Sequence, residues 1–397
     1  MPKTFYIPYI MTSKKLNALL EAAQGKVFRA LALLLIMLLL SKPEVKAQSP
    51  FAGLEPLFTE PKHYVTRFAE EAPVIDGNLE DAAWEGAAWT DSFLDIEGDV
   101  KQKPAFDTRV KMLWDDTYLF IAAELKEPHV WATLEQRDEI IFHDNDFEVF
   151  LSPENSTHQY YEIEVNALNT IFDLFLPKPY RNGGGAMIPW NAEGLLTAVQ
   201  VQGTLNDPAD TDKGWTVEMA IPFRAVTIGN ETKVPEEGSL WRVNFSRVEW
   251  DTEINEGNYV KKKDDKGRFL PEHNWVWSPQ GLINMHYPER WGYLQFTRQK
   301  SGSGSPAFVF PYTEKQKNYL WLVYYKQKEY YQKHGKYAKS LARAGLKNMR
   351  DVVIDTQPNR LQLKATRHQF MATIQLPEGA VWSINQDGLI RLLKETP

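Results

Sequence analysis

Strand-length runs of alternating apolar and polar residues dominate the chain between residues 72 and 297. Successive side chains of a β-strand point to opposite faces, so this alternation predicts strands that each rest one face on a core. Polar and Gly- or Pro-containing turns separate the runs, which is typical of an antiparallel sandwich. The predicted strands are Thr108–Trp114, Tyr118–Leu125, Asp146–Leu151, Tyr160–Ala167, Ile171–Phe175, Thr197–Gln202, Gly214–Ile221, Trp241–Trp250 and Trp291–Phe296. The sequence therefore predicts a mainly β fold.

A corner is predicted ahead of these strands, from Pro73 to Trp84. Asp76 can bond its own following backbone, and Gly77 adopts a positive φ without steric cost, so the pair predicts a tight turn. Asn78 is a good cap for a short helix that follows, with Trp84 pointing inward. We expect strand, turn and helix in that order.

Four motifs follow one another along the chain and carry a resemblance only as an ordered set. They are Pro73–Trp84 (PVIDGNLEDAAW), Trp114–Ile121 (WDDTYLFI), Asn145–Leu151 (NDFEVFL) and Gly214–Glu218 (GWTVE). Together they resemble the family 9 carbohydrate-binding modules and their DOMON-like sandwich relatives, over roughly residues 72–296. The resemblance implies an antiparallel β-sandwich that binds a polysaccharide or oligosaccharide. It also implies a divergent branch, either stand-alone or attached to enzymes of polysaccharide degradation.

Residues 1–47 are predicted to be a secretory signal peptide. Ala30–Leu40 is an apolar run that follows several lysines and an arginine, and Val45–Ala47 resembles a cleavage site. Spanning a bilayer takes about 20 apolar residues, so this run is too short for an anchor. We expect export to the periplasm or the cell exterior, no membrane span in the mature chain, and a translation start at either Met1 or Met11.

The rest of the chain divides by composition. Residues 48–71 are expected to form an extended arm and residues 72–298 the sandwich. Residues 299–306 are a Gly/Ser-rich linker. Residues 307–397 predict one helix followed by a small antiparallel meander, for which the sequence suggests no function.

Charge and cysteine content exclude several classes of function. The formal net charge is -7, which disfavours nucleic acid as a partner because phosphate binding needs a concentrated basic surface. The chain has no cysteine, so disulfides, thiolate metal sites and a cysteine nucleophile are excluded.

Acidic residues gather on one face of a predicted hairpin. Asp146 and Glu148 share a face of its first strand, while Glu162, Glu164 and Asn166 share a face of its second. If the register joins these faces, four carboxylates crowd together, and facing like charges destabilise a sheet. Solvent, a basic residue, a cation or sugar hydroxyls must then offset the repulsion.

The predicted strand Trp241–Trp250 supplies possible counter-charges. Arg242, Asn244 and Ser246 share one face and Arg247 lies on the other. Either arginine could neutralise the carboxylates. The alternative is a plain exposed polar face, which antiparallel sheets commonly have.

Sugar recognition also requires aromatic rings, and the resemblance suggests where they lie. The family's sheet glutamate falls on Glu148, its arginine on Glu164 and its first sugar-stacking tryptophan near Phe142, but its second falls near Met285 and is lost. The predicted ligand-binding residues are Phe142, Asp146, Glu148, Glu162, Glu164, Asn166, Trp190, Arg242, Asn244, Ser246 and Trp277.

Three further possibilities concern calcium, glycoside hydrolysis and haem. The family is known to bind calcium, and Asp144 and Asp146 offer suitable oxygens. The clustered carboxylates could alternatively serve a glycoside hydrolase. A haem-binding DOMON relative would need axial ligands from Met187, Met285 or His286.

Overall fold

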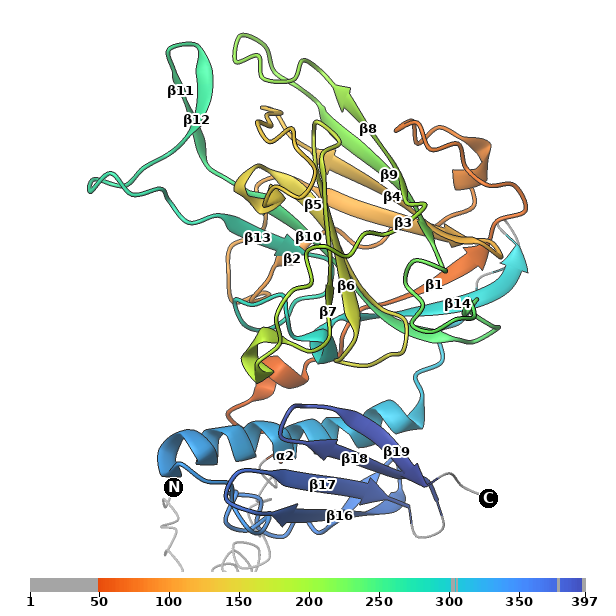
Figure 1. Cartoon of the computed structure of the whole chain (residues 1–397), viewed down its shortest axis with the longest axis vertical. Helices are drawn as coiled ribbons and strands as arrows, with labels where there is room; N and C mark the ends of the chain where they lie inside the picture. Colours follow the sequence, from red (N-terminus) through yellow and green to blue (C-terminus); the bar gives the residue numbers. More distant parts are fainter. Residues whose placement is uncertain (1–48, 301–303, 305, 377–378, 395–397) are drawn as a thin grey trace, which may run out of the picture. The chain divides into compact units, whose positions relative to one another are not determined.

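The predicted mainly β fold is confirmed in the computed structural model, which describes residues 49–300, 304, 306–376 and 379–394 (Figure 1). The described residues from Gly53 onward form one compact unit. The predicted signal peptide, residues 1–47, and part of the predicted linker lie outside the described residues. Within the described residues, no helix combines the length and apolarity needed to cross a membrane.

One large curled sheet forms the sandwich. Ten of its strands are hydrogen-bonded in the order β7-β6-β5-β10-β14-β1-β3-β4-β9-β8, with β13 beside β10 and β2 beside β13. The strands are β1 (His63–Phe68), β2 (Leu94–Asp95), β3 (Thr108–Trp114), β4 (Tyr118–Lys126), β5 (Asp146–Ser152), β6 (Tyr160–Asn166), β7 (Ile171–Leu176), β8 (Leu196–Gln202), β9 (Gly214–Pro222), β10 (Leu240–Glu249), β13 (His273–Val276) and β14 (Gly292–Lys300). A separate hairpin is formed by β11 (Thr252–Asn255) and β12 (Asn258–Lys261).

The segment expected to be an extended arm contains the strand β1. It pairs in parallel with β14, where His63 lies opposite Tyr293, and more briefly with β3. Tyr64 and Thr66 are buried on one side, and the Tyr64 hydroxyl donates to the backbone oxygen of Ala88 at 2.6 Å. The arm therefore joins the two halves of the sheet.

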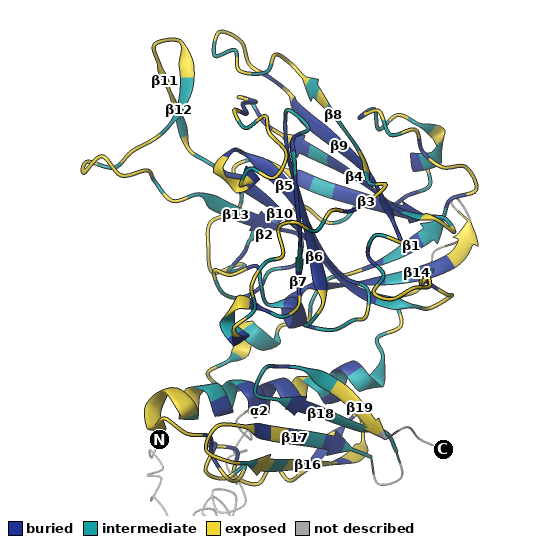
Figure 2. Cartoon of the chain, in the orientation of Figure 1, coloured by how far each residue is buried: buried dark blue, intermediate teal, exposed yellow. Residues whose placement is uncertain are grey.

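The main core lies inside the curled sheet, where β5 and β6 each contribute every second residue. Phe147, Val149 and Leu151 of β5 point into it, as do Ile163 and Val165 of β6. Figure 2 shows both strands buried along their length, which means that their opposite face is covered as well.

The predicted Asp76–Gly77 turn is present and is held from a distant strand. The N–H groups of both residues donate to Glu218 Oε2, at 3.0 and 2.8 Å, and Trp84 Nε1 donates to Oε1 at 2.6 Å. A Cβ on Gly77 would lie 2.9 Å from the backbone nitrogen of Gln200, at a φ of +87°. Two of the ordered motifs thus meet at one carboxylate.

The helix expected after this turn is only a three-residue 3-10 turn, η2 (Ala82–Trp84), and Asp81 precedes it. The predicted Asn78 cap is therefore wrong, since Asn78 Oδ1 accepts the N–H of Glu80 in a local turn. Similar short turns are η1 (Glu55–Phe58), η3 (Ile141–His143), η4 (Tyr180–Asn182) and η5 (Pro288–Arg290).

The C-terminal part has the predicted helix and small sheet. The helix α2 (Tyr312–His334) ends at Gly335, which adopts φ 62° and donates its N–H to Tyr331 at 2.8 Å. It packs against the third and fourth strands, β17 and β18, of a five-stranded antiparallel meander (Figure 1). The strands of the meander are β15 (Asp351–Ile354), β16 (Gln357–Ala365), β17 (Phe370–Gln375), β18 (Val381–Asn385) and β19 (Ile390–Lys394).

Candidate functional site

The register of three neighbouring strands gathers the predicted acidic residues. Glu148 on β5 lies opposite Glu164 on β6 and opposite Ser246 on β10. Asp146 and Asn166 form the adjacent pair of the same hairpin. Because directly opposed residues project to the same side of a sheet, these side chains share one face, as the sequence predicted.

This face is buried, which the sequence did not predict. A second apolar cluster covers it, formed by residues that include Ile141 of η3, Met285 and Trp291. Asp146 is 0% exposed and Glu148 is 5% exposed. Since Met285 takes part in this cover, the position of the family's second tryptophan is filled by an apolar side chain.

Burial changes the protonation of the acidic face. It raises the pKa of Glu148 to about 7. Burial, with the charge of Glu148 next, raises the pKa values of Asp146, Glu162 and Glu164 well above their ordinary range. Low polarity disfavours the charged form of each carboxyl group, and neighbouring charges of the same sign add to the effect.

Two carboxylate oxygens on this face lack a hydrogen-bond partner among the described residues, Asp146 Oδ2 and Glu162 Oε2. The Ser246 hydroxyl lies beside Glu148, and its hydrogen bond lowers the pKa of that carboxyl group against the larger effect of burial. Asp146, Glu148 and Glu164 can each place one carboxylate oxygen within 4.8 Å of the others. We call Asp146, Glu148, Glu162 and Glu164 the carboxylate cluster.

Arg247, one of the two predicted counter-charges, lies on the opposite face of β10. Its guanidinium forms ion pairs with Glu127 and with Glu249, the latter at 2.8 Å, and all three side chains are buried. It also donates to the hydroxyl of Thr108 at 3.1 Å. Arg247 therefore neutralises a different pair of carboxylates.

Arg242, the second candidate, shares the face of the cluster but pairs beyond it. Its Nη2 donates to Glu314 Oε2 of α2 at 2.9 Å, and its Nη1 donates to the backbone oxygen of Trp291 at 2.9 Å. The prediction that an arginine of β10 balances the cluster is wrong, because both arginines are committed to other carboxylates.

Asp144, one of the two predicted metal ligands, is occupied by hydrogen bonds. Its oxygens accept from the Thr133 N–H and hydroxyl, from the Leu134 N–H and from Asn166 Nδ2, at 2.7 to 3.0 Å. Asn166 is engaged in turn, as its Oδ1 accepts two backbone N–H groups. The structure brings Asp146, but not Asp144, into the group of three converging carboxylates.

The amide of Asn244 and two of the three predicted aromatic rings also have structural partners. Asn244 bonds both backbone groups of Ser278, at 2.8 and 2.9 Å. Trp277 lies in the main core, and Trp190 packs on Tyr161 with ring centroids 4.9 Å apart. Trp277 therefore presents no ring face to solvent.

Phe142 is the predicted ring that remains at the surface, and it lies at the edge of the cluster. It is 36% exposed, and its N–H donates to Glu164 Oε2 at 3.1 Å. Trp250 is half-buried beside it and donates from Nε1 to the Phe142 backbone oxygen at 2.9 Å.

Tyr180 is a further exposed ring near the cluster that the sequence did not single out. It is 44% exposed, and burial together with the charges of Glu162 and Glu164 raises its pKa. Tyr180 and Trp250 were missed because each lies at the end of an element, where no alternation marks its direction. We call Phe142, Tyr180 and Trp250 the aromatic rim.

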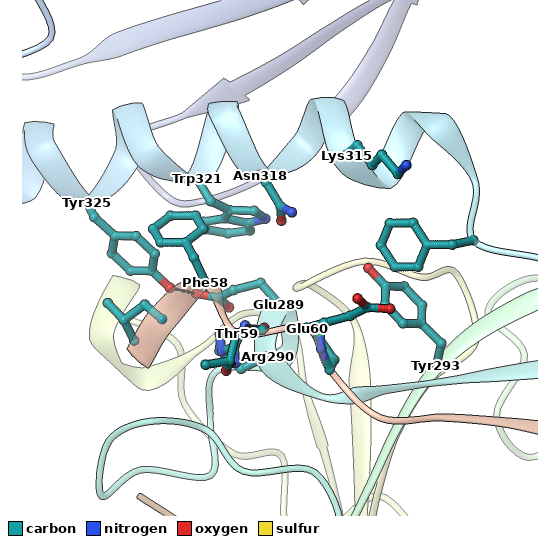
Figure 3. A pocket seen from close by; sticks show the side chains of 13 residues that line it. Phe58, Thr59, Glu60, Glu289, Arg290, Tyr293, Lys315, Asn318, Trp321 and Tyr325 are labelled. Atoms are coloured by element: carbon teal, nitrogen blue, oxygen red, sulfur yellow. Dashed lines mark hydrogen bonds between the residues drawn. The ribbon is translucent and has the colours of Figure 1, made fainter. Parts of the chain in front are cut away.

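A cavity of about 560 Å³ borders the aromatic rim, because Trp250, Glu272 and Trp275 are among the residues that line it. Another of about 330 Å³ is lined by residues of η1, η5 and α2, among them Phe58 and Trp321 (Figure 3). In the second cavity the Glu289 carboxylate already accepts hydrogen bonds from Arg181 and from the Tyr325 hydroxyl.

Comparison with known proteins places the sandwich in context. Residues 75–268 match the sequence model of a family described as "Carbohydrate family 9 binding domain-like". Exoglucanase XynX of Acetivibrio thermocellus is 26% identical over 160 residues, which make up 40% of this chain and 12% of that enzyme. The chain thus corresponds to a small part of that enzyme.

Two solved structures show a family 9 carbohydrate-binding module from Caldicellulosiruptor kristjanssonii, one in complex with cellotriose and one with glucose. Each is 15% identical to this chain, with TM-scores of 0.37 and 0.36. They cover 62% and 61% of this chain and the whole of the module.

Proposed function

Because residues 75–268 belong to the family 9 carbohydrate-binding modules, we propose that this chain is an exported, non-catalytic protein that binds a polysaccharide or oligosaccharide. The family match carries this proposal. The two related structures contain cellotriose and glucose, so a β-glucan is the first ligand to test.

The sugar is proposed to bind at the aromatic rim, at the edge of the covered carboxylate cluster. Phe142 and Tyr180 offer partly exposed rings for the C–H face of a sugar, whereas the ring of half-buried Trp250 carries Lys261 Nζ at 3.6 Å. Of the carboxyl groups at this edge, Glu148 keeps 5% of its surface exposed and can accept a hydrogen bond from a sugar hydroxyl. The contact between the Phe142 N–H and Glu164 supports this placement, since it links the rim to the cluster.

A binding role is favoured over hydrolysis by the arrangement of the carboxyl groups. Glycosidases place two carboxyl groups on either side of the scissile bond, about 5 to 10 Å apart. Here Asp146, Glu148 and Glu164 lie side by side on one wall, with oxygens within 4.8 Å. Such a wall can recognise hydroxyl groups but does not flank a glycosidic bond.

The binding experiment is a glycan-array screen of the purified protein with and without Ca²⁺, followed by titration calorimetry with cellotriose. We expect saturable binding that Glu148→Ala weakens by about 1–3 kcal/mol, because a hydroxyl loses a buried acceptor. Glu154→Ala is the matched control, since Glu154 lies in the β5–β6 loop in an exposed ion pair with Lys233. Absence of any saturable glycan would refute the proposed function.

Export is tested separately. N-terminal sequencing of the protein recovered from the periplasm or the culture medium is expected to begin at Gln48, directly after the predicted cleavage site. Recovery of a cytoplasmic protein that keeps residues 1–47 would contradict export without affecting the binding proposal.

A further inference from the structure

The cavity between η1, η5 and α2 has a wall of aromatic rings (Figure 3). The rings are those of Phe58, Tyr293, Phe310, Trp321 and Tyr325. Phe58 meets Tyr325 edge to face with ring centroids 6.0 Å apart, and Phe310 meets Tyr293 in the same way at 5.4 Å. Every residue that lines the cavity lies outside residues 75–268. The cavity is therefore built outside the part of the chain that matches the family.

The cations that line the cavity are already paired. Arg290 of η5 donates to the backbone oxygen and to the hydroxyl of Thr59, at 2.7 and 2.5 Å, and so ties η5 to the segment after η1. Lys315 of α2 forms an ion pair with Asp355. An anionic ligand would therefore find no unpaired cation among the lining residues, and it would also meet the Glu289 carboxylate.

Trp321 offers an unused hydrogen-bond donor to this cavity. It is only 5% exposed, yet its Nε1 has no hydrogen-bond partner among the described residues. The benzene edge of its indole points to the meander, where a Cβ on Gly388 would lie 3.1 Å from Cη2 and 3.2 Å from Cζ3. The pyrrole edge, which carries the N–H, is the opposite edge of the ring system. Because Trp321 lines the cavity, a ligand oxygen there can accept this N–H.

Two more polar side chains at the mouth of the cavity have no partner in the described chain. Asn318 lies one turn before Trp321 on the same face of α2, and Figure 3 shows both on the side that faces η1 and η5. Glu60 follows η1, and its exposed carboxylate forms no ion pair or hydrogen bond there. An amide both donates and accepts, and a carboxylate accepts. The cavity thus combines unpaired donors and acceptors with aromatic rings.

We propose that this cavity is a second binding site, which takes a neutral mono- or disaccharide. Sugar hydroxyls can donate to Glu60 and to the Asn318 oxygen and can accept from the N–H groups of Trp321 and Asn318, while the C–H face of the sugar rests on the aromatic wall. An alkylammonium ligand would leave these N–H groups unpaired, and an apolar ligand would leave every polar group unpaired.

The size of the cavity agrees with a short ligand. Ligand cavities span about 300–1,000 Å³, and about 330 Å³ lies at the small end of that range, which favours one or two sugar rings over a longer chain. The site goes beyond the proposed function because it shares no residue with the aromatic rim or the carboxylate cluster. It also gives α2, for which the sequence suggested no function, a role in ligand binding.

The test is calorimetric titration of the purified protein and of Glu148→Ala with cellobiose, maltose and lactose. Glu148→Ala weakens binding at the aromatic rim, so saturable binding at one site per chain should remain in it for at least one of these sugars. Adding Asn318→Ala or Trp321→Phe to Glu148→Ala should lower the remaining affinity about 5- to 10-fold, because each removes hydrogen bonds to the sugar. Gln332→Ala, which changes an exposed amide at the end of α2, is the matched control and should leave the affinity unchanged.

Two results would overturn the second site. One is the absence of saturable binding of all three sugars in Glu148→Ala, and the other is a remaining affinity that neither substitution on α2 lowers. Asn318→Ala changes only an exposed side chain, so it decides the question even if Trp321→Phe does not fold. The two proposals fail separately: binding that is lost in Glu148→Ala alone refutes the second site, whereas binding that only the α2 variants weaken refutes the site at the aromatic rim.

Discussion

The two faces of β10 differ in whether their buried carboxylates have a cationic partner. On one face, Arg247 lies between Glu127 and Glu249 and pairs with both. On the other face, Ser246 lies beside the carboxylate cluster, and no arginine or lysine of the described chain forms an ion pair with a member of that cluster, since Arg242 pairs with Glu314. A buried ion pair that is complete holds elements together, whereas buried acids without a partner are costly to keep. A ligand that binds these carboxyl groups on the second face would therefore lower the cost of burying them.

The largest expected effect is on the neutralised face. Arg247→Met should lower the free energy of unfolding by about 3–5 kcal/mol, because it leaves Glu127 and Glu249 buried without their cation. Urea unfolding followed by tryptophan fluorescence measures this. The matched control is Arg268→Met, which removes an exposed pair with Asp264 and should cost about 0–1 kcal/mol. Equal losses in the two variants would show that Arg247 has no special role.

His286 tests how the stability of the side of the sheet that carries the carboxylate cluster depends on pH. Burial, followed by the charge of Arg181, lowers the pKa of His286 to about 4, while its Nδ1 lies 3.0 Å from the Tyr160 hydroxyl. Between pH 6.5 and pH 4 the unfolded chain therefore binds more protons at His286 than the folded chain. Stability should fall by about 1–3 kcal/mol as the pH drops through this window.

The contribution of His286 is isolated by comparison with His286→Gln, because carboxyl groups titrate in the same range. Urea unfolding of both proteins at pH 7 and pH 4.5 gives the two differences. The parent protein should lose more stability than the variant. Identical losses would mean that His286 titrates normally in the folded state.

The smallest expected effect is an increase in the free energy of unfolding. Glu162→Gln, measured in EDTA at pH 7.5, should raise the free energy of unfolding by about 1 kcal/mol, since it removes the cost of burying or protonating a carboxyl group beside Glu148. Glu253→Gln on β11 serves as the exposed control and should stay within about 0.5 kcal/mol of the parent. A loss of stability in Glu162→Gln would indicate that Glu162 makes a favourable contact that the cluster needs.

Much of the sheet could be predicted because apolar and polar residues alternate along a strand whose two faces lie in different environments. The strands from β3 to β10 are of this kind, and β3 has the predicted bounds. The strand β1 was missed because it is short, follows Pro61 and finds its parallel partner far along the chain. The helix after Asn78 was wrong because the turn before it is tied to Glu218, a contact that no local signal reveals.

The gathering of acids was predictable for a local reason: β5 and β6 form one hairpin, whose loop sets their register. Their burial was not, since the cover comes from Ile141, Met285 and Trp291, which belong to separate segments. The ion-pair partner of Arg242 could not be predicted either, because Glu314 lies on a helix outside the sandwich. Local pattern predicts which residues share a face, but only the folded chain decides what covers that face.

The parallel pairing of β1 with β14 sets an order of events during synthesis. His63 lies opposite Tyr293, so β1, the first strand of the sheet, cannot pair with β14 until β14 has been synthesised. At about 5–20 residues per second, that interval is about 10–50 s. The join between the halves of the sheet therefore closes only after nearly all of the sandwich has left the ribosome, and until then the edges of β3 and β1 are open to other chains.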